Sequence, residues 1–299
     1  MADRAPVAAV LALLLNALVW GLSWWPFRLL QGHGLHPLWA TCLMFSVAVA
    51  CVFAVAPLVL ASWRGQPLLW LLAAASGLTN VGFNWAVTIG DVVRVVLLFY
   101  LMPAWSVLLA WPLLGERPTA ASIARLLLAL AGVMIVLRPE ASGWPWPSGL
   151  ADMLALLGGF SFALTNILLR RLNGTASEAR MLAMFGGGAG LALLVALGGM
   201  AQGAVPAVPP PTLAWVGVAA ALACAFLASN LALQYGAARL RAQTTSLVML
   251  SEIVFAALSS VALGAAQLDA RVLLGAALIL GAAAWSVWPP RSGATAGAQ

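Results

Sequence analysis

Charged residues are scarce in this sequence, and lysine is absent. Only 7% of the 299 residues are charged, whereas 64% are hydrophobic. A soluble globular domain carries about 25% charged residues, so the composition excludes a soluble protein and predicts one that crosses a membrane several times. The 14 basic residues are all arginines, placed mostly near the ends of apolar runs. Because no basic cluster is interleaved with aromatic residues, we expect no binding to nucleic acid.

Residues that bind metals or cofactors are equally scarce. The three cysteines (Cys42, Cys51 and Cys224) lie within apolar runs and lack metal-ligand spacing, so we expect packing residues and no metal site. His33 and His36 share one loop and are expected to be solvated. The chain also lacks a phosphate-binding loop, and we expect no cofactor.

The same scarcity argues against catalysis. An enzyme embedded in a membrane needs a nucleophile with a base, or paired acids that hold a metal. No predicted helix carries a histidine, and Glu252, the only acid deep within an apolar run, has no acidic neighbour. An enzyme is therefore not expected, and it stays a less favoured alternative beside a channel.

Ten apolar runs are long enough to cross a bilayer, which takes roughly 20 residues per helix. Short segments rich in glycine, proline and charge separate them. The first run continues beyond the length of a signal peptide and lacks a cleavage site, so we expect it to be retained. The sequence predicts an all-α polytopic membrane protein with helices at residues 7–29, 37–62, 68–88, 92–114, 119–137, 148–169, 180–200, 212–236, 242–263 and 269–288.

The arginines predict the orientation, because cytoplasmic loops carry an excess of positive charge. With the N-terminus inside, the larger group of arginines also lies inside: Arg4, Arg64, Arg117, Arg125, Arg170, Arg171, Arg180, Arg239, Arg241 and Arg291. The outer side receives Arg28, Arg94, Arg138 and Arg271. We therefore expect both termini in the cytoplasm, in a multi-pass protein of the bacterial inner membrane.

The five runs of the second half repeat those of the first. Residues 156–174 match 14–32 at a constant offset, and later landmarks follow in the same order: Trp20/Phe162, Ser23/Thr165, Arg28/Arg170, Gly32/Gly174, Asn84/Asn230, Gly90/Gly236, Gly115/Gly264 and Gly132/Gly281. A unit with an odd number of crossings enters the membrane in opposite senses in its two copies, as in alternating-access transporters. We expect two inverted five-helix repeats (5+5), residues 1–143 and 144–290, and a cytoplasmic tail, residues 291–299.

Three stretches carry a resemblance to a known family. They are residues 18–24 (LVWGLSW), residues 113–119 (LLGERPT) followed by AGV at 131–133, and residues 233–239 (LQYGAAR) with 250–255 (LSEIVF). These stretches resemble the drug/metabolite transporter superfamily, in particular its ten-helix branch built from two EamA repeats. The Trp-rich first helix and residues 102–105 (MPAW) look closest to bacterial exporters of aromatic amino acids. The resemblance implies a secondary transporter.

Polar side chains within the apolar runs outline a candidate substrate pathway, because such groups are costly in lipid and face a cavity or another helix. Asn80, Asn84 and Thr88 share one helix face. Polar residues of this kind also link helices by hydrogen bonds, so both interpretations stay open. With the neighbouring aromatic residues, the pathway candidates are Trp20, Ser23, Trp24, Asn80, Asn84, Tyr100, Trp105, Phe162, Thr165, Asn166, Asn230, Gln234 and Glu252.

Glu252, the aromatic residues and Pro103 each predict a specific role. The desolvated carboxyl group of Glu252 suits proton coupling or the capture of a substrate ammonium group, and hydrogen bonding to a neighbouring helix is the alternative. Aromatic residues suit a pocket for apolar side chains, although Trp and Tyr also form belts at membrane interfaces. Pro103 removes a hydrogen bond near the middle of its helix and is the hinge candidate.

The sequence thus predicts a secondary transporter that exports small metabolites, with aromatic or other neutral amino acids as the leading substrates. Exporters of cationic drugs or nucleotide sugars are the alternatives within the same class. The expected partners are a small-molecule substrate and membrane lipid, for a chain that acts as a monomer. Proton antiport and facilitated diffusion both stay open.

Overall fold

The computed structural model describes residues 4–115, 117–137, 146–147, 149–172, 174–237, 239, 248–249, 251–265 and 269–287. All regular elements within these ranges are helices, which confirms the predicted all-helical fold. The first half contains α1 (Arg4–Leu22), α2 (Trp24–Gly32), α3 (Pro37–Val55), the short 3₁₀ helix η1 (Val59–Trp63), α4 (Pro67–Ile89), α5 (Val92–Phe99), α6 (Met102–Leu114) and α7 (Ala120–Leu137). The second half contains α8 (Leu150–Arg171), α9 (Ser177–Ala201), α10 (Leu213–Ala237), α12 (Ser251–Ala262) and α13 (Ala270–Val287).

Two expected helices are each broken in the middle, and proline explains both breaks. α1 ends at Leu22 and α5 ends at Phe99. In each case a proline, Pro26 or Pro103, stands four residues later, where an uninterrupted helix would need its N–H to bond the carbonyl group of that last residue. The expected helix over residues 92–114 is broken where the hinge candidate Pro103 predicts it, near the start of α6. Movement at this hinge stays a prediction.

α3 is shorter than the sequence predicts. A single helix over residues 37–62 was expected, but α3 ends at Val55 and a separate 3₁₀ turn follows. Pro57 accounts for the difference, because a proline disfavours the helical conformation of the residue before it. Ala56 accordingly leaves the helix with φ −139° and ψ 69°.

Within the described residues, six helical segments are long and apolar enough to cross a membrane: Val7–Gly32, Pro37–Val55, Val92–Leu114, Leu150–Arg171, Ser177–Ala201 and Leu213–Leu233. α4 has the length but is more polar, because it carries Ser76, Thr79, Asn80, Asn84 and Thr88. Its position between α8 and α9 shields those side chains from lipid. These segments support a multi-pass membrane protein.

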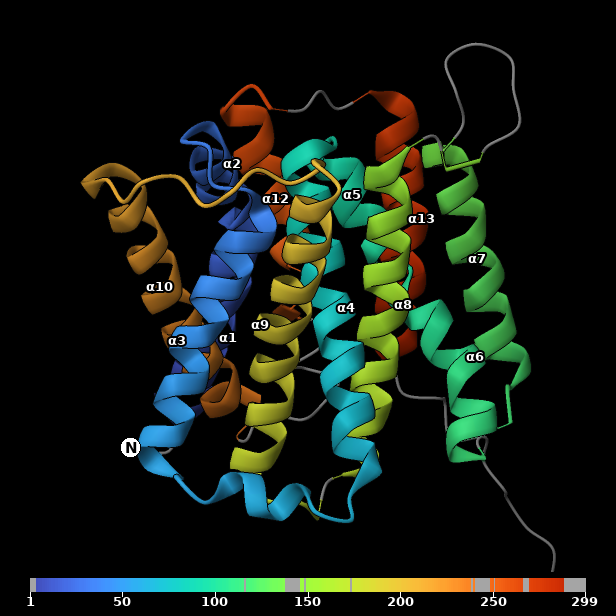
Figure 1. Cartoon of the computed structure of the whole chain (residues 1–299). Helices are drawn as coiled ribbons and strands as arrows, with labels where there is room; N and C mark the ends of the chain where they lie inside the picture. The colour runs from blue at the N-terminus through green and yellow to red at the C-terminus, as the bar shows by residue number, and fades with distance from the viewer. Residues whose placement is uncertain are drawn as a thin grey trace, which may run out of the picture.

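The helices stand side by side in a bundle, and successive runs alternate in direction (Figure 1). Within it, two groups of helices pack internally. In the α4 group, α4 packs against α8 and α9, and α8 also packs against α5 and α6. In the α1 group, α1 packs against α10 and α12, and α10 also packs against α2 and α3. α7 packs mainly against α13.

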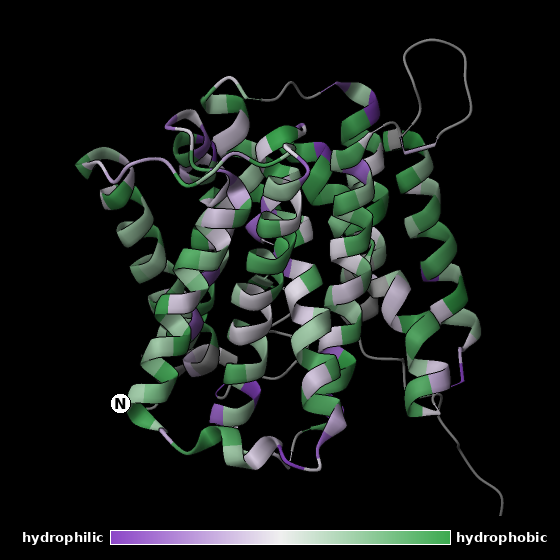
Figure 2. Ribbon diagram, viewed as in Figure 1, coloured by the Kyte–Doolittle hydropathy of each residue, from purple (hydrophilic) through white to green (hydrophobic). Residues whose placement is uncertain are grey.

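We name the two ends of the bundle by residues of α8. The Asp152 end is where α5 and α8 begin and α4 and α7 finish; the Arg170 end is the opposite end, where α8 finishes and α4 and α9 begin (Figure 1). Hydrophilic residues gather towards these ends, while the flanks of the bundle are mostly apolar (Figure 2). Of the three cysteines, Cys42 is buried as expected, but Cys51 and Cys224 are exposed and are not core residues.

Candidate functional site

A buried hydrogen bond joins the two halves of the chain near the middle of the bundle. Tyr100 lies in the turn between α5 and α6, and its hydroxyl group donates to Oε2 of Glu252, in the first turn of α12, over 2.9 Å. Both side chains are buried, with 3% and 8% of their surface exposed. Because the break before Pro103 ends α5 at Phe99, it places Tyr100 opposite Glu252. No arginine pairs with Glu252 among the described residues.

Aromatic rings extend from this pair across the bundle. The ring of Phe99 lies 5.5 Å from that of Phe162 and 4.8 Å from that of Phe83, measured between centroids. Trp20 continues the series, 6.4 Å from Phe83 and 4.4 Å from Phe226. We call these five residues the aromatic chain. Trp20 and Phe162, which are related by the sequence repeat, are only partly buried.

Sequence reasoning identified Trp20 and Phe162 but missed the three phenylalanines between and beside them. A phenylalanine in an apolar run looks like any other core residue, since burial in lipid and burial in protein select the same side chain. One signal was present: Phe83 precedes Asn84, and Phe99 precedes Tyr100. Phe83 and Phe99 therefore each stand next to a polar residue that was already a candidate.

One candidate amide, Asn84, links two helices, and the other, Asn80, bonds within its own helix. The Nδ2 atom of Asn84 donates to Oγ1 of Thr41 over 3.1 Å and ties α4 to α3. Asn80 donates to the carbonyl oxygen of Ser76 in its own helix, and it is partly buried. A further amide, Asn16, donates to the carbonyl and hydroxyl oxygens of Ser229 and ties α1 to α10. For Asn84 the helix-linking interpretation therefore has direct support.

Ser23 and Trp24 are buried at the break between α1 and α2. The indole Nε1 of Trp24 donates to Oγ of Ser259 over 3.0 Å and ties α2 to α12. The hydroxyl group of Ser23 donates to the carbonyl oxygen of Trp20, across the break between α1 and α2. Ser23 and Trp24 each expose 3% of their surface or less.

The remaining candidates differ in exposure. Thr165 is buried and its hydroxyl group has no partner among the described residues, whereas the next residue, Asn166, is exposed. Asn230 is partly buried. Trp105 is partly buried, with its ring 5.6 Å from that of Phe160. The side chains of Gln234 and Pro103 lie outside the described part of the structure.

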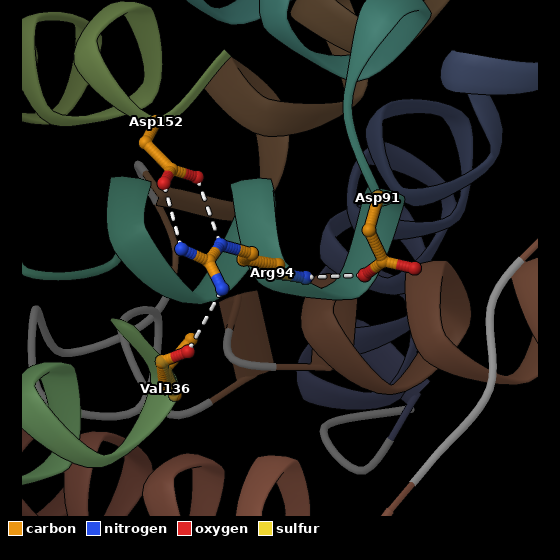
Figure 3. Close-up of polar contacts among 4 residues, drawn as sticks. All are labelled: Asp91, Arg94, Val136 and Asp152. Atoms are coloured by element: carbon orange, nitrogen blue, oxygen red, sulfur yellow. Dashed lines mark hydrogen bonds and ion pairs between the residues drawn. The ribbon is translucent and has the colours of Figure 1, made fainter. Parts of the chain in front are cut away.

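The Asp152 end contains an ion pair that sequence reasoning missed. Arg94 of α5 donates from Nε and Nη2 to the two carboxylate oxygens of Asp152 in α8, over 2.9 and 2.7 Å (Figure 3). Its Nη1 atom also donates to the carbonyl oxygen of Val136 in α7. The backbone N–H of Arg94 is capped by Asp91. Arg94 thus braces α5, α7 and α8, beyond the orientation signal that its charge provides.

The environment of His36 differs from the expected one. It was expected to be solvated, but it is partly buried, and its Nδ1 atom accepts a hydrogen bond from the backbone N–H of Leu38 over 3.3 Å. Its ring lies 5.2 Å from that of Trp85, edge to face. Burial lowers the pKa of the His36 imidazole. His33 is exposed, as expected.

Known proteins resemble this chain in family and in fold. Residues 7–138 match the EamA-like transporter family. A crystal structure described only as that of a protein has a TM-score of 0.57 and 22% sequence identity, and the likeness covers 94% of this chain and 96% of that chain. No curated protein matches the chain. The first half is thus similar to membrane transporters of small solutes, and the fold is shared over nearly the whole chain.

Proposed function

We propose that this chain is a secondary transporter that exports small metabolites across the bacterial inner membrane, with aromatic or other neutral amino acids as leading substrates. Transport proceeds by alternating access between two inverted five-helix repeats, with the substrate bound at the seam between them. The observation that carries the proposal is the buried Tyr100–Glu252 pair at that seam, flanked by the aromatic chain.

The pattern of helix packing supports the inverted repeat. If the two repeats are exchanged, the pair α4–α8 becomes α10–α1, and the pair α4–α9 becomes α10–α3. In the same way, the contact of α5 and α6 with α8 becomes the contact of α12 with α1. All of these pairs pack together in the described structure. The pairs α3–α9, α5–α12 and α7–α13 exchange into themselves, and they also pack. A pseudo-two-fold axis produces this pattern, whereas an arbitrary ten-helix bundle has no reason to.

The same symmetry gives the site its position. A helix pair that exchanges into itself lies beside the pseudo-two-fold axis, which runs in the membrane plane. Tyr100 and Glu252 join such a pair, α5 and α12, so their hydrogen bond lies near the middle of the membrane. No cation pairs with Glu252 among the described residues, and a carboxyl group buried without a cation is costly. A proton or a substrate ammonium group that binds Glu252 reduces that cost, which links substrate binding to this residue.

The orientation follows from the arginines. Arg64, Arg170, Arg171 and Arg180 lie at the Arg170 end, and Arg28 and Arg94 lie at the Asp152 end. The positive-inside rule then assigns the Arg170 end to the cytoplasm.

Uptake into proteoliposomes tests the proposal. The purified protein is given a panel of labelled amino acids and one organic cation, with and without an imposed pH gradient. We expect saturable uptake of aromatic amino acids, lowered roughly tenfold or more in Glu252→Gln, because loss of a charged hydrogen-bonding partner costs about 1.5–3 kcal/mol. Glu178→Gln, an exposed acid in the first turn of α9, is the matched control and keeps wild-type uptake.

Three outcomes contradict parts of the proposal. Flat uptake for every amino acid sinks the leading substrate assignment, and uptake of the organic cation alone favours a cation exporter, for which a buried carboxyl group is equally suited. Unchanged transport with unchanged pH dependence in Glu252→Gln removes Glu252 from the mechanism. Tyr100→Phe, which keeps the ring and removes only the hydroxyl donor, repeats the test with a smaller change.

A further inference from the structure

Two glycines bring the first helix of each proposed repeat against the Tyr100–Glu252 pair. Gly21 lies in the last turn of α1, and a methyl carbon built on it would lie 2.7 Å from the carbonyl oxygen of Glu252 in α12. Gly159 lies in α8, and a methyl carbon built there would meet the carbonyl oxygen of Phe99 at the end of α5. Non-bonded heavy atoms in contact normally lie about 3.5–4.0 Å apart. Glycine, which has no Cβ, permits these close approaches of helix to helix.

The contact at Gly21 lies on the face of α12 that carries Glu252. The amide nitrogen of Ala256, four residues after Glu252 and therefore on the same face, would lie 3.1 Å from the added methyl carbon. Further along this face, Ser259 accepts a hydrogen bond from Trp24 of α2. The position of α12 against α1 and α2 is thus set along the face that presents Glu252.

The contact at Gly159 acts on the other partner of the pair. The carbonyl carbon and Cα of Phe99 would lie 3.1 and 3.2 Å from a methyl carbon on Gly159, beside the carbonyl oxygen. Tyr100 is the next residue, and its hydroxyl group donates to Glu252. A shift of α5 on α8 would therefore move Tyr100. Each partner of the hydrogen bond is held at its backbone by a glycine from a different first helix.

The repeat itself does not require glycine at either position. Its constant offset aligns Gly21 with Ala163 and Gly159 with Ala17. Both alanines are fully buried, so a methyl group is accommodated at the equivalent position of the other copy. Glycine therefore stands in each first helix at the point where that helix meets one partner of the pair.

We propose that Gly21 and Gly159 are positioning residues for the site: they admit the backbones of α12 and α5 and so set the length of the Tyr100–Glu252 hydrogen bond. A methyl group on either glycine pushes its helix pair apart by roughly 0.5–1 Å to reach normal contact. An O–H···O bond tolerates a range of about 0.5 Å, so this displacement weakens or breaks it. The assignment deepens the proposed function and rests on it for the consequence in transport.

Fluorine NMR tests the assignment, because Tyr100 and Tyr235 are the only tyrosines in the sequence. The full chain is labelled with 3-fluorotyrosine at both positions and measured in detergent micelles. Tyr235→Phe assigns the two resonances, and Glu252→Ala gives the position of the Tyr100 resonance without its acceptor. The site variants are Gly21→Ala and Gly159→Ala.

Gly132→Ala is the matched control. A methyl carbon on Gly132 of α7 would lie 2.8 Å from the carbonyl oxygen of Gly275 in α13, so this variant overpacks a helix pair that carries neither partner. Gly190→Ala is the second control, since a methyl carbon built on Gly190 meets no atom within 4 Å among the described residues.

We expect the Tyr100 resonance to move in both site variants towards its position in Glu252→Ala, while the Tyr235 resonance stays. Neither control should move it. An equal movement in Gly132→Ala reports general loosening, and an unmoved resonance in both site variants shows that the bond does not depend on the glycines. Either result overturns the assignment, and movement in one site variant alone overturns it for the other glycine. A site variant that loses its single peak in size-exclusion chromatography also overturns it, because that glycine then serves the fold as a whole.

Uptake into proteoliposomes separates this assignment from the proposed function. If both hold, Gly21→Ala and Gly159→Ala lower the uptake of aromatic amino acids roughly tenfold, as expected for Glu252→Gln, and Gly132→Ala keeps wild-type uptake. Resonance shifts in a protein that carries no substrate uphold the positioning role and contradict the transporter. Substrate uptake with unmoved resonances upholds the transporter and contradicts the positioning role.

Discussion

The two ends of the bundle pack differently. At the Asp152 end, α2 and α3 lie on α4, and Arg28, Asn84 and His36 reach across. At the Arg170 end, the corresponding helices α8 and α9 do not pack extensively on α10 in the described structure. The difference teaches that the packing of α2 and α3 on α4 has no equivalent on α10, although the pairs α3–α9 and α5–α12 between the groups fit the proposed repeat.

The largest expected effect comes from breaking the Arg94–Asp152 brace at the Asp152 end, which joins α5 to α8. Asp152→Ala leaves Arg94 partly buried without its carboxylate partner, and removal of one member of a buried pair costs about 3–5 kcal/mol, less where the arginine is partly exposed. We expect a fall of about 2–4 kcal/mol in stability, seen as a lower midpoint of thermal unfolding in detergent.

Glu178→Ala serves as the control at the Arg170 end. Glu178 is an exposed acid in the first turn of α9, so its loss costs about 0.5 kcal/mol, the size of a helix-dipole interaction at a surface. Equal falls in the two variants would show that the brace adds nothing to the Asp152 end.

Helix placement was largely predictable, because ten long apolar runs leave few alternatives. The errors trace to proline. Residues 92–114 and 7–29 each read as one helix, and Pro103 and Pro26 divide them. Residues 37–62 also read as one helix, and Pro57 shortens it. In each case the long apolar run suggested one continuous helix, although the proline that breaks or shortens the helix was visible in the sequence.

Partners across the bundle were not predictable. Arg94 and Asp152 stand 58 positions apart, and Tyr100 and Glu252 stand 152 apart. A single sequence shows that such residues are costly in a membrane, which marks them as candidates. It does not show which pairs meet, since that depends on packing between helices. The repeat offered the one long-range constraint, and it related equivalent residues rather than partners.

A smaller effect is expected from one pair of repeat counterparts, Trp24 and Asn166. Trp24→Phe keeps an aromatic ring in the buried wall and removes the N–H that donates to Ser259, which costs about 1 kcal/mol, the typical net value of one hydrogen bond. Asn166→Ala changes an exposed side chain, and we expect a change within about 0.5 kcal/mol. Thermal unfolding of both variants in one detergent compares them. A larger loss in Asn166→Ala would mean that the Arg170 end is as tightly packed as the Asp152 end.

The smallest expected effect is a pH dependence confined to the Asp152 end. Burial places the pKa of His36 below its usual value in the folded protein, so the unfolded chain takes up the proton first as the pH falls. The contribution of His36 to stability is therefore complete above about pH 6.5, the usual value for histidine, and is lost as the pH falls through the folded pKa. His36→Asn keeps a side-chain acceptor for the N–H of Leu38, since asparagine is a favoured helix N-cap, and removes the titration. Between about pH 7.5 and about pH 5.5 the unfolding midpoint of the wild type should drop by about 1 °C more than that of His36→Asn. His33→Asn, at an exposed position in the same loop, should follow the wild type. If the two variants behave alike, the contact of His36 with Trp85 does not sense pH, and the Asp152 end is closed by Arg28 and Asn84 without it.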